Sequence, residues 1–450
     1  MQNILDRRHR KDAAIEGRSR GKEREEVMSI SKLRMSSAAG LVFAATAGTA
    51  GAQQVVIWCD VNGYGCPTLA PVVERYNAEN PGQTVVLEQV AYQVLLESLP
   101  VQLESSDGPD GAIVTDLGGL SRYYVDLTDW VDAEFFESEY GQTLQWLRGD
   151  DPDSTAINGK PSTLTVNGGY VNLTLFEQAG VDVPEEGATW EDWAEATRQV
   201  AAATGTDFPM AMDRSGHRFA SLAISYGAEL VDEDGNLVVD DALRDAIAQF
   251  VEWHRDGTMP MDLWGAVGGA THRELFTDFL NADTVMYFGG SWALNQVDRE
   301  VGDLFDWRAI DAPCGPGSCT VMPGGGAMVA FQHSAHPEIM GQFINYLAQP
   351  ENLEEVLAAS VEIPASATLI ERGVTYPGAS DRTQEALGTF INQIPKMDDA
   401  AYRFQGWRYQ RALMNSLTTR ISQVLNNELT VDAAVARIEQ DVTLAIEAAN

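Results

Sequence analysis

The chain has 450 residues, of which 44% are hydrophobic and 8% aromatic, a composition typical of a folded protein rather than a disordered one. It contains 30 Lys and Arg against 66 Asp and Glu, so its formal net charge is −36. This charge argues against nucleic acid and anionic membranes as partners, but it says little about a small ligand. The length is sufficient for two or three domains.

The first 52 residues are expected to be separate from the fold. From Met28 the sequence "MSISKLRMSSAAGLVFAATAGTAGA" places Lys32 and Arg34 before a short apolar stretch and ends in a small-x-small cleavage pattern. It predicts a secretory signal peptide over residues 28–52 and hence a periplasmic protein. Residues 1–27 are densely charged and too long for an ordinary n-region. We interpret them as an upstream extension that follows a wrongly assigned start codon.

Four cysteines occur as two local pairs, in "CDVNGYGC" (59–66) and "CGPGSC" (314–319). They allow three connectivities, but export to an oxidising compartment and the short loops favour Cys59–Cys66 and Cys314–Cys319. The alternative is a four-thiolate metal site. Zinc prefers C-x2-4-C spacing, which only the second pair approaches. We therefore expect two disulfides, no metal and no cofactor.

From residue 53 the sequence alternates apolar strands with amphipathic helices. Strands are expected at 55–58, 84–90 and 110–114, and helices within 68–82 and 92–103. Repeated strand–helix–strand units predict a parallel sheet with helices on its faces. Ligands of such sheets bind beyond the carboxyl ends of the strands, and this rule indicates residues 60–64, Tyr92 and Asp116.

The pattern changes from about residue 160. "GKPSTLTVNGGYVN" (159–172) is extended, and Thr189 then opens a helix with a capping-box spacing to Asp192. "AMVAF" (327–331) is again typical of a strand, and "VEIPAS" (361–366) is a further extended break before long C-terminal helices. The chain is therefore expected to leave one α/β lobe, build a second, return and leave again.

This pattern predicts lobe 1 over 53–164 and 325–362, and a helix-rich α/β lobe 2 over 165–324 and 363–450. Several extended crossings would join the lobes. Such crossings are suited to a hinge with a cleft between the lobes.

The landmarks resemble the extracellular solute-binding proteins of carbohydrate ABC importers, the family that includes maltose-binding proteins. Four segments carry the resemblance by their order and spacing: "ERYNAENPGQTVVLEQV", "YVNLTLFEQAGVDVPEEGATWEDWAEAT", "LFTDFLNADTVMYFGGSW" and "GGGAMVAFQHSAHPEIMGQFINYLAQPENLEEVLAASVEIPAS". The resemblance implies the class II periplasmic-binding-protein fold, two α/β lobes that close on a ligand by hinge bending. It implies no catalysis, and a membrane permease that recognises the closed form.

A sugar site needs a flat aromatic platform and many directional polar groups. Trp264 lies in the Gly-rich stretch "MPMDLWGAVGGA", which we expect to be an exposed loop. Trp292, in "VMYFGGSWALN", matches the family's Gly-x-Trp position, and Trp407, in "YRFQGWRYQ", begins a helix similar to one that faces the family's cleft. Core packing is the alternative for each ring, and helical spacing favours the core for Trp190 and Trp193.

Asp116 follows the third expected strand, where the family often uses a carboxylate to bridge two sugar hydroxyls. A helix N-cap is the alternative. Arg214 lies in the polar loop "AMDRSGH", and a surface ion pair is its alternative role. If Arg214 or Arg403 faces the ligand, an acidic or sulfonated sugar would fit. The predicted ligand-binding residues are Asn62, Tyr92, Asp116, Tyr170, Asp213, Arg214, Trp264, Gly290, Ser291, Trp292, Gly325, Arg403 and Trp407.

We therefore predict a monomeric periplasmic binding protein, not an enzyme, which delivers a mono- or oligosaccharide or a sugar derivative to an ABC permease. Gly289 and Gly290 are expected to let backbone amides approach the hydroxyl edge of the sugar. One alternative keeps the fold but changes the ligand to a polyamine, a peptide or a glycerol-linked phosphodiester. Another is an exported glycosidase that uses two carboxylates.

Overall fold

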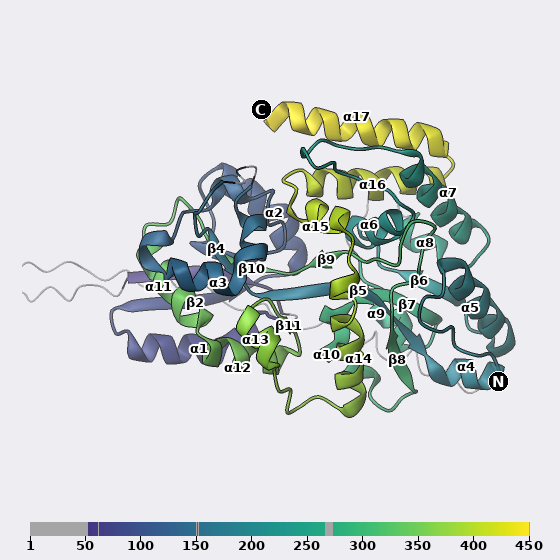
Figure 1. The fold of residues 1–450 in the computed structure, drawn as a ribbon, viewed down its shortest axis with the longest axis horizontal. Coiled ribbons are helices and arrows are strands. Elements are labelled where there is room, and N and C mark those ends of the chain that lie inside the picture. The colour runs from purple at the N-terminus through teal and green to yellow at the C-terminus, as the bar shows by residue number, and fades with distance from the viewer. Residues whose placement is uncertain (1–52, 62, 150, 152, 266–272, 450) are drawn as a thin grey trace, which may run out of the picture. The chain divides into compact units, whose positions relative to one another are not determined.

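The computed structural model describes residues 53–61, 63–149, 151, 153–265 and 273–449, and within them the strands form two sheets (Figure 1). The expected extension and signal peptide, as well as the candidate Asn62, lie outside the described residues. None of the described helices is long and apolar enough to cross a membrane. Nor do the described His, Cys, Asp and Glu side chains form a group that could hold a metal ion.

The first sheet contains five described strands in the order β2–β1–β3–β10–β4. They are Gln53–Cys59 (β1), Gln83–Gln89 (β2), Gly111–Val114 (β3), Gly159–Pro161 (β4) and Ala327–Ala330 (β10). β1 pairs in parallel with β2 and β3, as the strand–helix alternation predicted, whereas β10 runs antiparallel to β3 and β4. The helices of this part are Cys66–Glu79 (α1), Tyr92–Glu104 (α2), Ala133–Leu144 (α3), Pro337–Ala348 (α11), Pro350–Ser360 (α12) and Ala367–Arg372 (α13).

Helix α1 illustrates how the sequence builds this layer. Leu69, Val72, Val73 and Tyr76 recur at helical spacing, and all four are buried where α1 packs against β2 and α12. The helix ends at Asn80, whose backbone N–H donates to the carbonyl of Tyr76. The apolar face predicted from the sequence is thus the face that meets the core.

The second sheet has the order β11–β5–β7–β6, and β8 and β9 also pair with β5. Its described strands are Thr163–Asn172 (β5), Phe208–Met212 (β6), Thr284–Gly290 (β7), Trp307–Ile310 (β8), Pro323–Gly324 (β9) and Ile363–Pro364 (β11). The helices of this part are Leu173–Ala179 (α4), Trp190–Thr204 (α5), Gly216–Ser225 (α6), Asp241–Arg255 (α7), Met261–Trp264 (α8), Phe276–Leu280 (α9), Leu294–Gln296 (α10), Asp381–Ile391 (α14), Asp399–Gly406 (α15), Gln410–Leu425 (α16) and Val431–Ala449 (α17).

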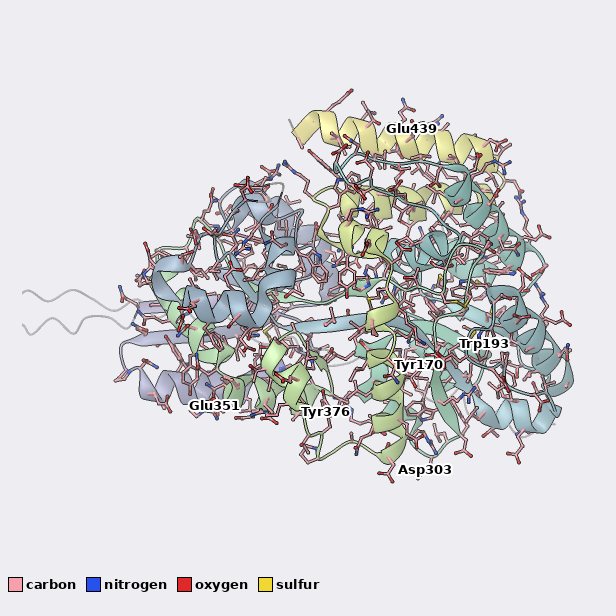
Figure 2. The ribbon with its side chains drawn as sticks, in the orientation of Figure 1. Tyr170, Trp193, Asp303, Glu351, Tyr376 and Glu439 are labelled. Carbon is pink, nitrogen blue, oxygen red and sulfur yellow. A yellow bond between two sulfur atoms is a disulfide. The ribbon has the colours of Figure 1, made fainter. Side chains whose placement is uncertain are left out.

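The core of this second part contains the tryptophans that helical spacing assigned to it. Thr189 and Asp192 form the predicted capping box at the start of α5, and Trp190 and Trp193 are both buried. Figure 2 shows Trp193 and Tyr170 inside this part of the molecule, and Glu439 on α17, which packs along α16. Aromatic rings therefore fill the interior around β5 and β7.

Both expected disulfides are present, Cys59–Cys66 and Cys314–Cys319. The first closes the loop of residues 60–65 between β1 and α1. The second lies beside the start of α5, where the Trp190 N–H donates to the Cys314 carbonyl over 3.1 Å. Each bridge therefore fixes a loop next to a helix start.

In the described part of the chain, the backbone passes between the two sheets at three places, which lie side by side. Residue 162 joins β4 to β5, residues 325–326 join β9 to β10, and β11 follows α12. Thr165 of β5 pairs with Gly324 of β9, and Leu164 pairs with Ile363 of β11. We call these paired segments, 162–166, 323–326 and 361–364, the crossing ribbon. The predicted lobe boundaries stay a prediction, and α13, which the sequence assigned to lobe 2, packs against α3 and α12 of the first part.

Gly325 lets two strands of the crossing ribbon approach each other closely. Its φ is +142°, and a Cβ added there would lie 2.0 Å from the carbonyl oxygen of Thr163. Both facts exclude a side chain at this position without a shift of the backbone.

We expect Gly325→Ala to lower the free energy of unfolding by about 1–3 kcal/mol, because of the positive φ and the contact with Thr163. Urea denaturation of the ligand-free protein measures this. The control is Gly388→Ala in α14, where an added Cβ meets no atom within 4 Å. Alanine there should be neutral or stabilising by up to about 1 kcal/mol. Equal effects of the two substitutions would contradict the prediction.

Candidate functional site

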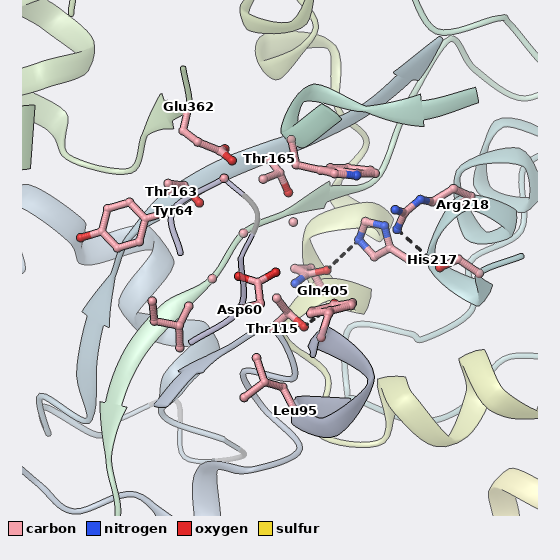
Figure 3. A pocket seen from close by; sticks show the side chains of 18 of the residues that line it. Asp60, Tyr64, Leu95, Thr115, Thr163, Thr165, His217, Arg218, Glu362 and Gln405 are labelled. Carbon is pink, nitrogen blue, oxygen red and sulfur yellow. Dashed lines mark hydrogen bonds between the residues drawn. The ribbon is translucent and has the colours of Figure 1, made fainter. Parts of the chain in front are cut away.

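A cavity lies between the two sheets, beside the crossing ribbon (Figure 3). Its empty space is about 1020 Å³, including space continuous with solvent. The first-sheet side contributes Asp60, Gly63, Tyr64, Tyr92, Leu95, Ile113 and Thr115, and the crossing ribbon contributes Thr163, Thr165, Gly324, Gly325, Gly326 and Glu362. The second-sheet side contributes Ser215, His217, Arg218, Glu274, Trp292, Gln405, Gln410, Arg411 and Met414.

The first-sheet wall follows the rule for parallel sheets. Asp60 and Thr115 come directly after β1 and β3, at the carboxyl ends of neighbouring strands. The disulfide-closed loop adds Tyr64, and Tyr92 begins α2 with its hydroxyl 2.8 Å from Oγ1 of Thr115. The edge that the strand pattern indicated is therefore an edge of the cavity.

The start of α6 brings a histidine into the opposite wall. Nε2 of His217 lies 3.0 Å from the carbonyl oxygen of Pro323 and 3.2 Å from Oε1 of Gln405, so this nitrogen is the donor. Burial and the positive charge of Arg218 lower the pKa of His217 to about 3. The ring is thus neutral near pH 7. Its Nδ1 is a buried acceptor with no hydrogen-bond partner among the described residues.

Trp292 is held in this wall by a buried ion pair. The Arg218 guanidinium carbon lies 4.0 Å from the centroid of the half-buried Trp292 ring, a cation–π geometry. Nη2 of Arg218 lies 3.3 Å from Oδ2 of Asp213, whose other oxygen accepts the Leu275 N–H over 2.8 Å. Asp213, a predicted ligand contact, is fully buried and does not line the cavity. It holds Arg218 against the tryptophan instead.

The glycines before Trp292 make room for rings of the protein, not for a sugar. A Cβ on Gly290 would lie 1.9 Å from the Trp292 ring, and one on Gly289 would lie 2.6 Å from the Tyr287 hydroxyl. Ser291 is buried and accepts the Val166 N–H over 3.1 Å. Neither Gly290 nor Ser291 lines the cavity in this structure, and ligand contact at these two positions stays a prediction.

Trp264 lies in the core and not in an exposed loop, contrary to the sequence prediction. Its exposed fraction is 0%, its Nε1 donates to the Met212 carbonyl over 3.0 Å, and its ring meets Phe250 edge-on at 4.7 Å. Arg214 donates to the Trp264 carbonyl and to Oγ of Ser422, each over 2.6 Å. Both residues pack in the interior, because α8 folds against the neighbouring helices. Neither of them lines the cavity.

Three further candidates also lie away from the cavity. Tyr170 is fully buried, and its hydroxyl donates to the Gly290 carbonyl over 2.9 Å. Arg403 donates to Glu229 over 3.3 Å, and Nε1 of Trp407 donates to the Gly235 carbonyl over 2.9 Å. These two contacts fasten the α15 region to the loop at residues 229–235, so the side chains point away from the cavity.

Asp116 lies just behind the cavity wall rather than in it. Burial raises the pKa of Asp116, whereas the charge of Arg411 and the Gly119 N–H act in the opposite direction. Its Oδ1 has no hydrogen-bond partner among the described residues. Asp116 therefore balances the charge of Arg411, which does line the cavity.

Three of the predicted residues line the cavity, namely Tyr92, Trp292 and Gly325. Their contact with a ligand stays a prediction. The sequence also marked segments that contribute residues it did not select. "AMDRSGH" supplies Ser215 and His217, and "YRFQGWRYQ" supplies Gln405 and Gln410.

Glu362 is the most unusual cavity residue. Only 3% of it is exposed, and its Oε2 has no hydrogen-bond partner among the described residues. Figure 3 shows its carboxyl group directed from the crossing ribbon toward the space bordered by Asp60 and Thr165. Burial, together with the negative charge of Asp60, raises the pKa of Glu362 to about 8. No signal in the sequence distinguished this glutamate from the other acidic residues.

This raised pKa makes stability depend on pH. The folded protein keeps the Glu362 proton after the unfolded chain has released it, so the free energy of unfolding falls as pH rises from about 4.5 to about 8. Glu362→Gln carries no such proton. We expect the stability of this variant relative to wild type to increase from pH 5 to pH 8, as measured by urea denaturation. The surface variant Glu351→Gln serves as the control. An advantage of Glu362→Gln that is constant or shrinks with pH would contradict the prediction.

Comparisons with known proteins agree with this architecture. A binding protein of Brucella abortus is 23% identical over 338 residues, which is 72% of this chain and 79% of that protein. An arabinooligosaccharide-binding protein of Bacillus subtilis is 20% identical over 320 residues, 67% of this chain and 70% of the relative. The structure of an ABC substrate-binding protein from Listeria monocytogenes in complex with cycloalternan has a similar fold, with a TM-score of 0.72, 15% identity, and coverage of 88% of this chain and 99% of that one.

The family indicated by the sequence motifs is confirmed by a family model. The model described as "Bacterial extracellular solute-binding protein" matches residues 67–354, well over half of the chain. Together with the two-sheet fold and its inter-sheet cavity, this match shows that the chain belongs to the bacterial extracellular solute-binding protein family.

Proposed function

We propose that this protein is an exported receptor that binds a carbohydrate in the cavity between its sheets and delivers it to the membrane subunits of an ABC importer. The observation that carries the proposal is Trp292, a half-buried ring in a wall that also presents hydroxyl, amide and carboxyl side chains. Sugars combine an apolar C–H face with a rim of hydroxyls, so they need both kinds of group.

The energetics require the whole cavity and not only the ring. Covering roughly 50 Å² of apolar surface on Trp292 contributes about 1–1.5 kcal/mol. A micromolar dissociation constant corresponds to roughly 8 kcal/mol, so hydrogen bonds of about 0.5–1.5 kcal/mol each must supply the rest. The cavity offers such groups from both sheets, namely Thr115, Thr163, Thr165, Ser215, Gln405 and Gln410.

The relatives support a sugar as the ligand. One is named for binding an arabinooligosaccharide, and the similar solved structure holds cycloalternan. The alternative of an acidic or sulfonated sugar depended on Arg214 or Arg403 facing the ligand. Both arginines donate to protein groups away from the cavity, so the structure gives that alternative no support through these residues.

A thermal-shift screen of the mature protein against mono-, di- and oligosaccharides tests the proposal. A sugar at a hundred times its dissociation constant should stabilise the protein by about 2.7 kcal/mol. Chromatography of the mixture should recover the sugar unchanged. Turnover of the sugar would favour a glycosidase, and a shift only with polyamines, peptides or phosphodiesters would refute a carbohydrate ligand.

Trp292→Ala should weaken binding of the sugar found in that screen about tenfold, because the stacking surface is lost. Its cost to the ligand-free protein should be about 1–2 kcal/mol, less than for a fully buried ring, since the Trp292 ring packs against the core but is only partly buried. Calorimetry and urea denaturation measure the two effects.

Trp264→Ala is the matched control, because this ring is fully buried and does not line the cavity. It should lose about 3–5 kcal/mol of stability. Unchanged affinity in Trp292→Ala, or a loss of stability as large as in the control, would mean that Trp292 is a core residue.

A further inference from the structure

We infer that Glu362 and Asp60 form a subsite for an amino group of the ligand, so that the protein prefers amino sugars to the matched neutral and acidic sugars. This inference rests on the proposed carbohydrate-binding function. It specifies which class of carbohydrate the cavity selects.

The carboxyl group of Glu362 is held in place, but its Oε2 makes no hydrogen bond to another described residue. A Cβ on Gly63 would lie 2.3 Å from Oε1 of Glu362, so the carboxyl group rests directly on the backbone of the disulfide-closed loop. The backbone carbonyl of Glu362 accepts the Tyr376 hydroxyl over 2.8 Å, which anchors the residue. Glu362 lines the cavity, and its Oε2 is buried behind the surface with no partner among the described residues. Such a group costs free energy unless a ligand satisfies it.

The charge near Glu362 is negative. Asp60 lines the same side of the cavity, and its charge acts on Glu362. Lys160 does not line the cavity, and its Nζ donates to the Tyr64 hydroxyl over 3.3 Å and to the Pro161 carbonyl over 3.2 Å. In the described part of the chain, no ion pair joins Glu362 to a basic side chain.

The two arginines of the cavity do not offset this charge. Arg218 is paired with the buried Asp213, and Arg411 acts on Asp116 behind the wall. Arg218 thus has an acidic partner of its own, whereas Arg411 only lies near one, and its buried Nε has no hydrogen-bond partner among the described residues. Asp60 and Glu362 therefore make their end of the cavity acidic.

An ammonium group matches this acidic end better than a hydroxyl does. It carries three donors and one positive charge, so its binding favours release of the proton that Glu362 otherwise keeps up to a pH of about 8, and it can then bond to both carboxylates and balance their repulsion. Hydrogen bonds to ionised groups are roughly twice as strong as neutral ones. A uronic acid would bring a third negative charge to the same place and is disfavoured.

Calorimetry with matched sugars tests the inference on the full mature protein. The probes are glucose, galactose and mannose, their 2-amino-2-deoxy forms and their uronic acids, together with β-1,4-linked glucosamine oligomers and the corresponding glucose oligomers. We expect the best-bound amino sugar to bind at least about tenfold more tightly than its neutral counterpart. The acid should bind most weakly.

Glu362→Gln should reduce this preference to near unity. Asp60→Asn provides a second variant at the same subsite. Glu274→Gln, on the opposite wall of the cavity, is the matched control and should keep the preference. Melting curves of each variant establish that it is folded.

The outcomes separate this inference from the proposed function. Neutral sugars that bind as well as amino sugars, or a preference that survives in both Glu362→Gln and Asp60→Asn, would overturn the amine subsite and leave carbohydrate binding intact. Binding of no saccharide in this series or in the wider screen would overturn both proposals.

Discussion

The pairing of β5 with β9 and β11 is the constraint on which the site depends. Three segments far apart in the sequence meet in the crossing ribbon, with Leu164 opposite Ile363 and Thr165 opposite Gly324. Their backbones satisfy one another, so their side chains are left to face the space between the sheets. The ribbon thereby connects the two halves of the fold and supplies part of the cavity wall, including Thr163, Thr165 and Glu362.

Buried polar groups behind the cavity wall give the cavity its shape without touching its interior. Asp213 receives an N–H, a tyrosine hydroxyl and a guanidinium, and through the guanidinium it fixes the ring of Trp292. Gly290 contributes the absence of a side chain, which the Trp292 ring requires, and a carbonyl that accepts the Tyr170 hydroxyl. Several residues predicted as ligand contacts therefore lie behind the cavity wall, where burial and hydrogen bonding hold a neighbour in place.

Much of the fold followed from local patterns. Apolar periodicity placed α1 and its neighbouring strands, the capping box located the start of α5, and short loops indicated both disulfides. The residues of the cavity were harder to predict from the sequence, because the direction in which the side chains face changes within a few residues. Gln405 and Trp407 are two positions apart in one stretch, yet only the glutamine reaches the cavity. Local sequence patterns could not predict the burial of Trp264, because it depends on the packing of α8 against other helices.

The Cys59–Cys66 bridge has a consequence for when the protein becomes able to bind. The loop that it closes carries Asp60 and Tyr64 into the cavity and supports the carboxyl group of Glu362. In a reduced chain this loop has more conformations open to it, and ordering it costs additional entropy. Forming the bridge therefore lowers the entropy cost of completing the first-sheet wall, and such bridges form and persist in oxidising compartments.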